Sequence, residues 1–242
     1  MKSAFITGAS KGIGRSIATV LARNGYSLSL LGNRNMTMLE ELANTLRAEY
    51  SVNIFTYQCD LKDSVSLEKV CQQALSDMKH FDLIINNAGI ASVGLFNDMT
   101  VEEWNDLFSI NVTSCFVTCK TLVPSMINKK SGHVINISSM WGTVGASCEV
   151  AYSASKGAMN SFTKALAKEL APSNISVNAI ACGVVDTDMN SHLSSEEKAE
   201  LADAIPACRF ASPDEIAEIV LKISESPTYL TGQIIGVDGG YI

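Results

Sequence analysis

The stretch Thr7-Gly8-Ala9-Ser10-Lys11-Gly12-Ile13-Gly14 follows a short apolar run, Ser3–Thr7, and leads into a helical pattern. Glycines here permit a tight turn and let backbone N–H groups approach a pyrophosphate at the start of the helix. The spacing Gly-x3-Gly-x-Gly differs from the common Gly-x-Gly-x-x-Gly, and glycine-rich turns often only connect two elements. The position after a first strand nevertheless favours a dinucleotide-binding turn. Its expected cofactor contacts are Gly8, Ser10, Lys11, Gly12, Ile13 and Gly14.

Beyond this turn, the chain alternates between short apolar runs and longer helical patterns. The runs are nearly continuous, which suits strands that are buried on both faces of a parallel sheet. They lie at Ser27–Leu31, Asn53–Tyr57, Leu83–Asn86, His133–Ser138, Ser176–Ile180 and Ile234–Val237. The helical patterns include Ile13–Arg23, Met38–Glu49, Val65–Met78, Val101–Asn128, Tyr152–Leu170 and Pro213–Ser224. The alternation predicts a doubly wound α/β layer, and the absence of a linker predicts one domain over residues 1–242.

Composition narrows the function further. The chain has 242 residues, of which 47% are hydrophobic, and a formal net charge of −7. The negative charge argues against a nucleic-acid partner. No secretory signal and no apolar stretch near the length of a membrane span are recognised, so the expected location is the cytoplasm. The three histidines, His80, His133 and His192, are scattered, and no catalytic metal is expected.

The region after the second strand indicates which dinucleotide is bound. Many NAD enzymes place an acidic residue there to hold the ribose 2′-hydroxyl. This chain has Leu31-Gly32-Asn33-Arg34-Asn35 instead, without an acid. Lys11 and Arg34 could pair with a 2′-phosphate, although either could also be a solvated surface charge. Together these features favour NADP(H).

The ends of the third and fourth strands supply further candidate cofactor contacts. Asp60 and Leu61 follow the third strand, and Asn87, Ala88 and Gly89 follow the fourth. Both groups are well placed to line an adenosine site, because ligands of open parallel sheets lie beyond the carboxyl ends of the strands. Asp60 could instead cap the next helix.

Ser139, Tyr152 and Lys156 are the candidate catalytic residues. Ser139 ends the fifth strand, and Tyr152 and Lys156 are four residues apart, on one face of a helix. A fixed positive charge beside a phenol stabilises the phenolate, so Lys156 is expected to lower the pKa of Tyr152. Ser139 could hydrogen-bond a substrate oxygen as charge develops on it. Taken singly, each residue could equally be a cap, a packing residue or a surface group.

Asn111 is a polar residue inside the apolar helical pattern Val101–Asn128. A buried amide there needs a hydrogen-bond partner. It could be a satisfied core amide, the mark of a helix irregularity, or a functional group.

The sequence resembles the short-chain dehydrogenase/reductase family over essentially its whole length. The resemblance rests on Thr7-Gly8-x3-Gly12-x-Gly14, Asn86-Asn87-Ala88-Gly89, Asn111, Ser139 and Tyr152-x3-Lys156, all in family order. It implies a Rossmann-like doubly wound parallel sheet of seven strands flanked by helices. It also implies a catalytic set of Ser139, Tyr152, Lys156 and Asn111, with Tyr152 as the proton donor and NADPH as the hydride donor. Lys156 and Tyr152 would also contact the nicotinamide ribose, and Asn111 would support a water-linked proton route.

After the sixth strand, the resemblance implies that Gly183, Val185 and Thr187 bind the cofactor, with Thr187 facing the carboxamide. Family members usually have Pro-Gly where this chain has Cys182-Gly183. The cysteine is expected to be a tolerated small residue or a redox-sensitive thiol. Residues 188–207 would form a lid over the substrate.

Within the family, the C-terminal half is most similar to the 3-oxoacyl acyl-carrier-protein reductases of fatty acid biosynthesis. That similarity implies reduction of a 3-oxoacyl thioester, a carrier protein that docks near Lys129 and Lys130, and a homotetramer. Ser173 stands where a second basic residue would be expected. One alternative is a dehydrogenase or ketoreductase of a steroid, sugar or small secondary alcohol. A non-catalytic nucleotide sensor is another, although such a protein would be expected to lose Tyr152 or Lys156.

Overall fold

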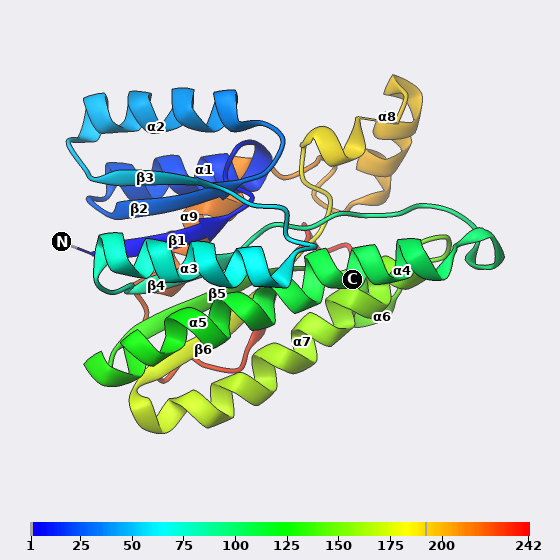
Figure 1. Ribbon diagram of the computed structural model, residues 1–242. Helices are drawn as coiled ribbons and strands as arrows, with labels where there is room; N and C mark the ends of the chain where they lie inside the picture. The colour runs from blue at the N-terminus through cyan, green and yellow to red at the C-terminus, as the bar shows by residue number, and fades with distance from the viewer. Residues whose placement is uncertain (1, 192) are drawn as a thin grey trace.

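The computed structural model describes residues 2–191 and 193–242, so His192 lies outside the described residues. Its centre is a parallel sheet of seven strands in the order β3-β2-β1-β4-β5-β6-β7 (Figure 1). The strands are β1 (Ser3–Thr7), β2 (Ser27–Gly32), β3 (Ile54–Gln58), β4 (Leu83–Asn86), β5 (Gly132–Ser139), β6 (Ile175–Cys182) and β7 (Ile234–Val237). The order reverses between β1 and β4, where a ligand crevice forms in sheets of this kind. The predicted Rossmann-like fold is confirmed.

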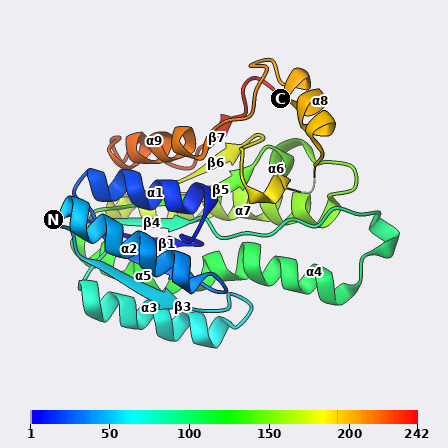
Figure 2. The same cartoon turned by 90° about the horizontal axis from the view of Figure 1, so that it is seen from above.

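Helices cover both faces of the sheet (Figures 1 and 2). One face carries α1 (Gly12–Arg23), α2 (Met36–Tyr50) and α9 (Pro213–Ser224). The other carries α3 (Ser64–Met78), α5 (Ser114–Lys129) and α7 (Val150–Leu170). The remaining α-helices are α4 (Val101–Phe108), α6 (Trp141–Val144) and α8 (Ser195–Ala204).

Burial on two faces explains why the strands are continuous apolar runs. Every residue of β1, β2, β4, β5 and β6 is buried apart from His133, which is half-buried, whereas the edge strands β3 and β7 are partly exposed. Two hydrophobic clusters lie on opposite faces, one against α1 and α9 and the other against α3 and α5. The sheet is therefore rigid where its central strands end.

The predicted continuous helix Val101–Asn128 is wrong in one respect. Its register is interrupted by a π-helical turn, Ser109–Thr113, between α4 and α5. Asn111 lies within this turn and is fully buried. A π-turn inserts an extra residue into the helix, and such turns are frequent at functional sites.

The helical run that contains Asn111 also contradicts the expectation that no apolar stretch approaches the length of a membrane span. Val101–Lys129 is long and apolar enough, by length and composition, to cross a bilayer, with a mean hydropathy of 1.3. Half of its most apolar window is buried inside the protein. The inner face of α5 packs against the sheet and α3, which accounts for its apolar composition.

The segment after β6 is lightly packed between the buried residues Val185 and Ile205. It contains a short 3₁₀ turn, Asp188–Asn190, followed by α8. Ser194 caps α8 through a capping box with Glu197. No described residue of α8 is buried, and the helix projects from the body of the protein (Figure 1).

Candidate active site

The glycine turn is shaped by residues that follow β4. The hydroxyl of Thr7 accepts hydrogen bonds from the backbone N–H groups of Asn87 at 3.1 Å and Ala88 at 3.0 Å. The Asn87 side chain donates to the carbonyls of Thr7 at 2.9 Å and Gly8 at 3.1 Å. Asn87 was predicted to contact the cofactor, but its amide nitrogen is engaged in holding the turn. These bonds fasten the ends of β1 and β4 together.

Close approach explains the glycines of the turn. Gly8 and Gly12 have φ angles of 66° and 53°, a region that favours glycine. A Cβ at Gly14 would lie 2.2 Å from the Gly8 carbonyl oxygen and 2.5 Å from the Asn87 amide nitrogen. The turn therefore requires glycine at this position for packing as well as for ligand access.

The start of α1 fits the pyrophosphate of a nicotinamide dinucleotide. Lys11 is the N-cap residue but makes no side-chain capping bond, and the first turn contains no acidic residue. The first amides of a helix lack intrahelical partners and carry a partial positive charge, so they attract an anion. Ser10 is buried and Ile13 is half-buried beside them.

At the proposed adenosine end, Arg34 and Asp60 are both exposed. Arg34 makes no ion pair within the described parts of the chain, which leaves its guanidinium available. The Asp60 carboxylate accepts from the Lys62 N–H at 3.0 Å, in its own turn. Asp63, and not Asp60, caps α3, so the capping alternative for Asp60 is wrong. Leu61 is buried behind the turn.

Residues 183–187, which follow β6, lie close to the glycine turn. A Cβ on Gly12 would meet the Thr187 methyl carbon at 3.3 Å, so these residues are neighbours. Gly183 packs against the backbone of Asp238, where a Cβ would lie 2.6 Å from the Asp238 Cα. Val185 is buried and forms a parallel bridge with Ala211.

Cys182 is also buried, beside Ser139 in the register of β5 and β6. Burial raises the pKa of its thiol to about 12. The thiol is therefore protonated and a poor nucleophile at neutral pH, which supports the interpretation of a tolerated small residue.

Ser139 and Tyr152 meet at the end of β5. Ser139 hydrogen-bonds the Tyr152 phenol, and its hydroxyl oxygen accepts from the Trp141 N–H at 3.2 Å. Tyr152 is only 8% exposed. Figure 1 shows how α7, which carries the tyrosine, runs beside β5 and β6.

Lys156 is buried one turn further along α7. Its ammonium donates to the Ile137 carbonyl at 2.8 Å and lies 5.6 Å from the centre of the Tyr152 ring. Burial lowers its pKa. A Cβ at Gly89 would lie 3.4 Å from the Lys156 Nζ, so this glycine leaves room beside the ammonium.

The predicted lowering of the Tyr152 pKa by Lys156 is not the net result in this structure. Burial raises the pKa of Tyr152 above its ordinary value of 10.0, and the hydrogen bond from Ser139 opposes this only in part. The expectation considered charge alone and omitted the cost of placing a phenolate in a buried position. Tyr152 is therefore held in its proton-donating form.

Asn111 joins the loop after β4 to α7. Its side chain accepts from the Ile90 N–H at 2.9 Å and donates to the Ile90 carbonyl at 2.9 Å. It also donates to the Ser155 hydroxyl at 3.0 Å. The alternatives of a satisfied core amide and a helix irregularity both hold, and the amide positions the helix that carries Tyr152 and Lys156.

Sequence reasoning overlooked Ser155 and Asn160. The Ser155 hydroxyl donates to the Tyr152 carbonyl at 2.8 Å while it accepts from Asn111. Asn160 accepts from the Ser138 hydroxyl at 2.6 Å and donates to the Gly142 carbonyl at 3.1 Å. One signal was available, because Asn160 is four residues beyond Lys156 and so shares its helix face.

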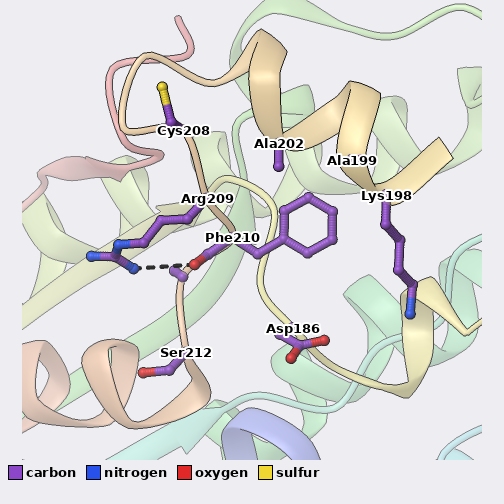
Figure 3. A pocket seen from close by; sticks show the side chains of 9 residues that line it. Asp186, Lys198, Ala199, Ala202, Cys208, Arg209, Phe210 and Ser212 are labelled. Carbon is purple, nitrogen blue, oxygen red and sulfur yellow. Dashed lines mark hydrogen bonds between the residues drawn. The ribbon is translucent and has the colours of Figure 1, made fainter. Parts of the chain in front are cut away.

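Two cavities lie near the proposed site. The larger, about 550 Å³, lies between α8 and the segment 208–212, with Asp186 at its edge, and none of the four candidate catalytic residues lines it (Figure 3). The smaller, about 160 Å³, adjoins Ala151, directly before Tyr152. Its apolar lining residues are Val93, Leu95, Phe96, Met99, Val150 and Ala151.

We predict that Gly14→Ala destabilises the protein by about 1–3 kcal/mol, because backbone atoms cannot easily make room for the new methyl group. Thermal unfolding and a fluorescence titration with NADPH would measure the loss of stability and of cofactor affinity. Gly94→Ala is the matched control, since a Cβ there would meet nothing within 4 Å. Equal behaviour of the two variants would contradict the packing argument.

Comparisons with known proteins agree with this geometry. Residues 2–198 match the profile of the short chain dehydrogenase family. An uncharacterized oxidoreductase, YmfI of Bacillus subtilis, is 44% identical over 241 residues, covering 99% of this chain and 98% of the relative. The 3-oxoacyl acyl-carrier-protein reductase FabG of Aquifex aeolicus is 37% identical over 243 residues, covering 99% and 96%.

A solved structure is similar over the whole chain. It is that of YwfH, an NADPH dependent reductase involved in bacilysin biosynthesis, with a TM-score of 0.94, 26% identity and coverage of 100% of this chain and 98% of that one. The profile match and the identities to relatives of nearly equal length exceed what a shared fold alone would produce. This chain is an oxidoreductase of the short-chain dehydrogenase family, which binds a nicotinamide cofactor.

Proposed function

We propose that the protein catalyses the NADPH-dependent reduction of a 3-oxoacyl thioester to the 3-hydroxyacyl form. The observation that carries the proposal is the meeting of Ser139, Tyr152 and Lys156 at the end of β5, beside a turn that fits a dinucleotide. FabG reductases at 34–37% identity over 99% of the chain support the thioester class.

In the proposed reaction, Tyr152 donates its phenolic proton to the substrate carbonyl oxygen. The glycine turn between β1 and α1 would hold NADPH, which would supply a hydride for the carbonyl carbon. Ser139, whose hydroxyl acts to lower the pKa of the Tyr152 phenol, would position and polarise the carbonyl. The Lys156 Nζ lies 5.6 Å from the centre of the Tyr152 ring and would contact the nicotinamide ribose. Asn111 holds α7 in place and would support proton resupply through water.

The preference for NADP(H) is supported by charge. Lys11 in the glycine turn and Arg34 after β2 are the basic residues proposed to contact the 2′-phosphate, and no acid follows β2. The solved relative of similar structure is NADPH dependent. The remaining cofactor contacts in the proposal are Gly8, Ser10, Gly12, Ile13, Gly14, Asp60, Leu61, Asn87, Ala88, Gly89, Gly183, Val185 and Thr187.

The proposed acyl chain would enter beside the small cavity next to Ala151, whose lining mixes apolar side chains with Ser92, Asp98 and Glu103, and residues 188–207 would form its lid. The carrier-protein contact has weaker support. Lys129 pairs with Asp82 at the amino end of β4, and the Lys130 carbonyl is bound by Asn174 before β6, whereas Tyr152 lies beyond the carboxyl ends of the strands. We therefore propose that the protein recognises the thioester part of its substrate, which coenzyme A could carry as well as a carrier protein.

Exposed apolar residues on α4 and α5 support the proposed homotetramer. Val101, Phe116 and Ile127 are 75%, 51% and 40% exposed. Apolar side chains on long helices are typical of surfaces that pack between subunits. We also propose that the protein is located in the cytoplasm.

The second candidate is reduction of a small free ketone. It is favoured by the ion pair between Lys129 and Asp82 and by Ser173, which stands where a second basic residue would be expected, since both weaken the basic surface that an acidic carrier would need. A panel of steroid, sugar and secondary-alcohol substrates would distinguish it from the thioester reductase.

We predict that purified protein consumes NADPH in the presence of acetoacetyl-coenzyme A, and that Tyr152→Phe lowers kcat by about 10²–10⁴-fold, as expected for loss of a general acid. The decrease in NADPH absorbance measures the rate. NADPH binding by the variant serves as the control for folding. Absence of turnover by the wild type, with NADPH binding intact, would contradict the thioester proposal.

We predict that kcat/KM for reduction at saturating NADPH stays level from about pH 7 to pH 9. Only protonated Tyr152 can donate a proton, and its raised pKa keeps it protonated as pH rises. Activity is therefore lost only when pH rises through that raised pKa, while the reverse oxidation becomes faster. A fall centred below about pH 8 would show that the effective pKa is lowered instead.

We predict that Lys11→Ala combined with Arg34→Ala weakens NADPH binding far more than NADH binding, by about tenfold or more, because two charge-assisted contacts to the 2′-phosphate are removed. Fluorescence titration of both cofactors measures the dissociation constants. Lys164→Ala combined with Lys168→Ala, which removes two exposed lysines of α7, controls for the change in net charge. Equal losses for the two cofactors would contradict the assignment.

A further inference from the structure

Lys11 already has a carboxylate partner in the lid. Its ammonium lies 3.0 Å from an Asp188 carboxylate oxygen, and the two side chains are 50% and 69% exposed. Asp188 directly follows Thr187, which touches Gly12. The cation proposed to recognise the 2′-phosphate is therefore the same cation that ties the lid to the glycine turn.

The end of the lid is anchored, because Ile205 is buried and the Ala207 N–H donates to the Gly239 carbonyl at 3.1 Å, but its middle is lightly held. No residue of α8 is buried, and the cavity of about 550 Å³ separates the helix from the segment 208–212 (Figure 3). The figure shows Lys198 and Ala202 of α8 facing Phe210 and Asp186 across this space. At the start of the lid, Asn190 donates to the Val185 carbonyl at 2.8 Å. A segment with few buried contacts opens at a small cost in free energy. An ion pair at the start of the lid can therefore shift the equilibrium between its closed and open positions.

We infer that Asp188 competes with the cofactor's 2′-phosphate for Lys11 and thereby helps to set the discrimination between NADPH and NADH. This inference rests on the proposed NADP(H) preference. A phosphate carries more negative charge than a carboxylate and accepts through three oxygens, so it draws the ammonium away from Asp188. Arg34, which has no ion-pair partner in the described chain, joins it on the phosphate. NADH has no 2′-phosphate and leaves the pair intact.

Two consequences follow from this competition. Asp188 weakens NADPH binding, because the cofactor must displace it, and the released carboxylate is repelled by the phosphate. The coupling is reciprocal, so binding of the 2′-phosphate loosens the tie between the lid and the glycine turn. Asp188 therefore acts through Lys11 as a positioning residue and makes no contact with the reacting atoms.

The test is a double-mutant cycle on cofactor affinity. Dissociation constants for NADPH and NADH are measured by fluorescence titration for the wild type, Asp188→Asn, Lys11→Met and the double variant. Asp188→Asn is expected to lower the NADPH constant roughly fivefold, the effect of one surface ion pair, and to leave the NADH constant within about twofold. In the Lys11→Met background the same substitution is expected to change neither constant.

Asp186→Asn is the matched control, because it removes a nearby exposed carboxylate that has no ion pair among the described residues. A purely general charge effect would make it equal to Asp188→Asn and would overturn the inference. An NADPH constant that is unchanged or raised in Asp188→Asn, while the wild type prefers NADPH, would also overturn it and would leave the proposed function standing. Equal wild-type affinities for both cofactors would instead overturn the proposed cofactor preference.

A second readout needs no cofactor. Lys198 is the one lysine or arginine in the segment 189–208, so trypsin cleavage after it reports on the exposure of α8. Asp188→Asn and Lys11→Met are both expected to be cleaved faster than the wild type and the Asp186→Asn control, as followed by mass spectrometry. Equal cleavage rates in all four proteins would show that the ion pair does not hold the lid.

Discussion

The hydrogen bonds between Thr7 and the Asn87-Ala88 backbone hold together the part of the molecule on which its chemistry depends. They fasten β1 to β4 at the point where the strand order reverses. The Asn87 amide donates to the Thr7 and Gly8 carbonyls. The Gly8 carbonyl oxygen and the Asn87 amide nitrogen then lie so close to Gly14 that this position has no room for a side chain. The start of α1 is thereby fixed beside the point where the strand order reverses between β1 and β4.

The loop after β4 is also linked by hydrogen bonds to α7, the helix that carries the proposed catalytic residues Tyr152 and Lys156. Two residues after Ala88, Ile90 is bound through both its N–H and its carbonyl by Asn111, and Asn111 donates to Ser155 on α7. The path from the glycine turn to Tyr152 is thus a chain of short hydrogen bonds, partly buried near the turn and fully buried between Asn111, Ser155 and the Tyr152 carbonyl. Buried polar groups are costly when unpaired, so a fully paired network of this kind admits few alternative arrangements.

Burial has a second effect at the site, since it acts on the charged groups themselves. It raises the pKa of Tyr152 and lowers that of Lys156, which opposes ionisation of both. A protonated phenol suits the donor in carbonyl reduction. The lid differs in physical character, because α8 has no buried residue and its base is tied by an exposed ion pair. The proposed active site is therefore rigid, whereas the proposed lid over it is loosely held between its two ends.

The sequence by itself determined the strands, their parallel arrangement and the candidate residues, because continuous apolar runs, glycine spacing and the Tyr152–Lys156 interval are local patterns. Three strands have the predicted bounds, and the others differ by one or two residues. Only the tertiary structure decided that Asn87 shapes the turn, that Asn111 lies in a π-turn, that Asp63 caps α3 and that Lys11 pairs with Asp188. It also reversed the expected direction of the Tyr152 pKa shift. Each of these depends on which distant groups meet and on how much water is excluded around them, and neither quantity is a property of neighbouring residues along the chain.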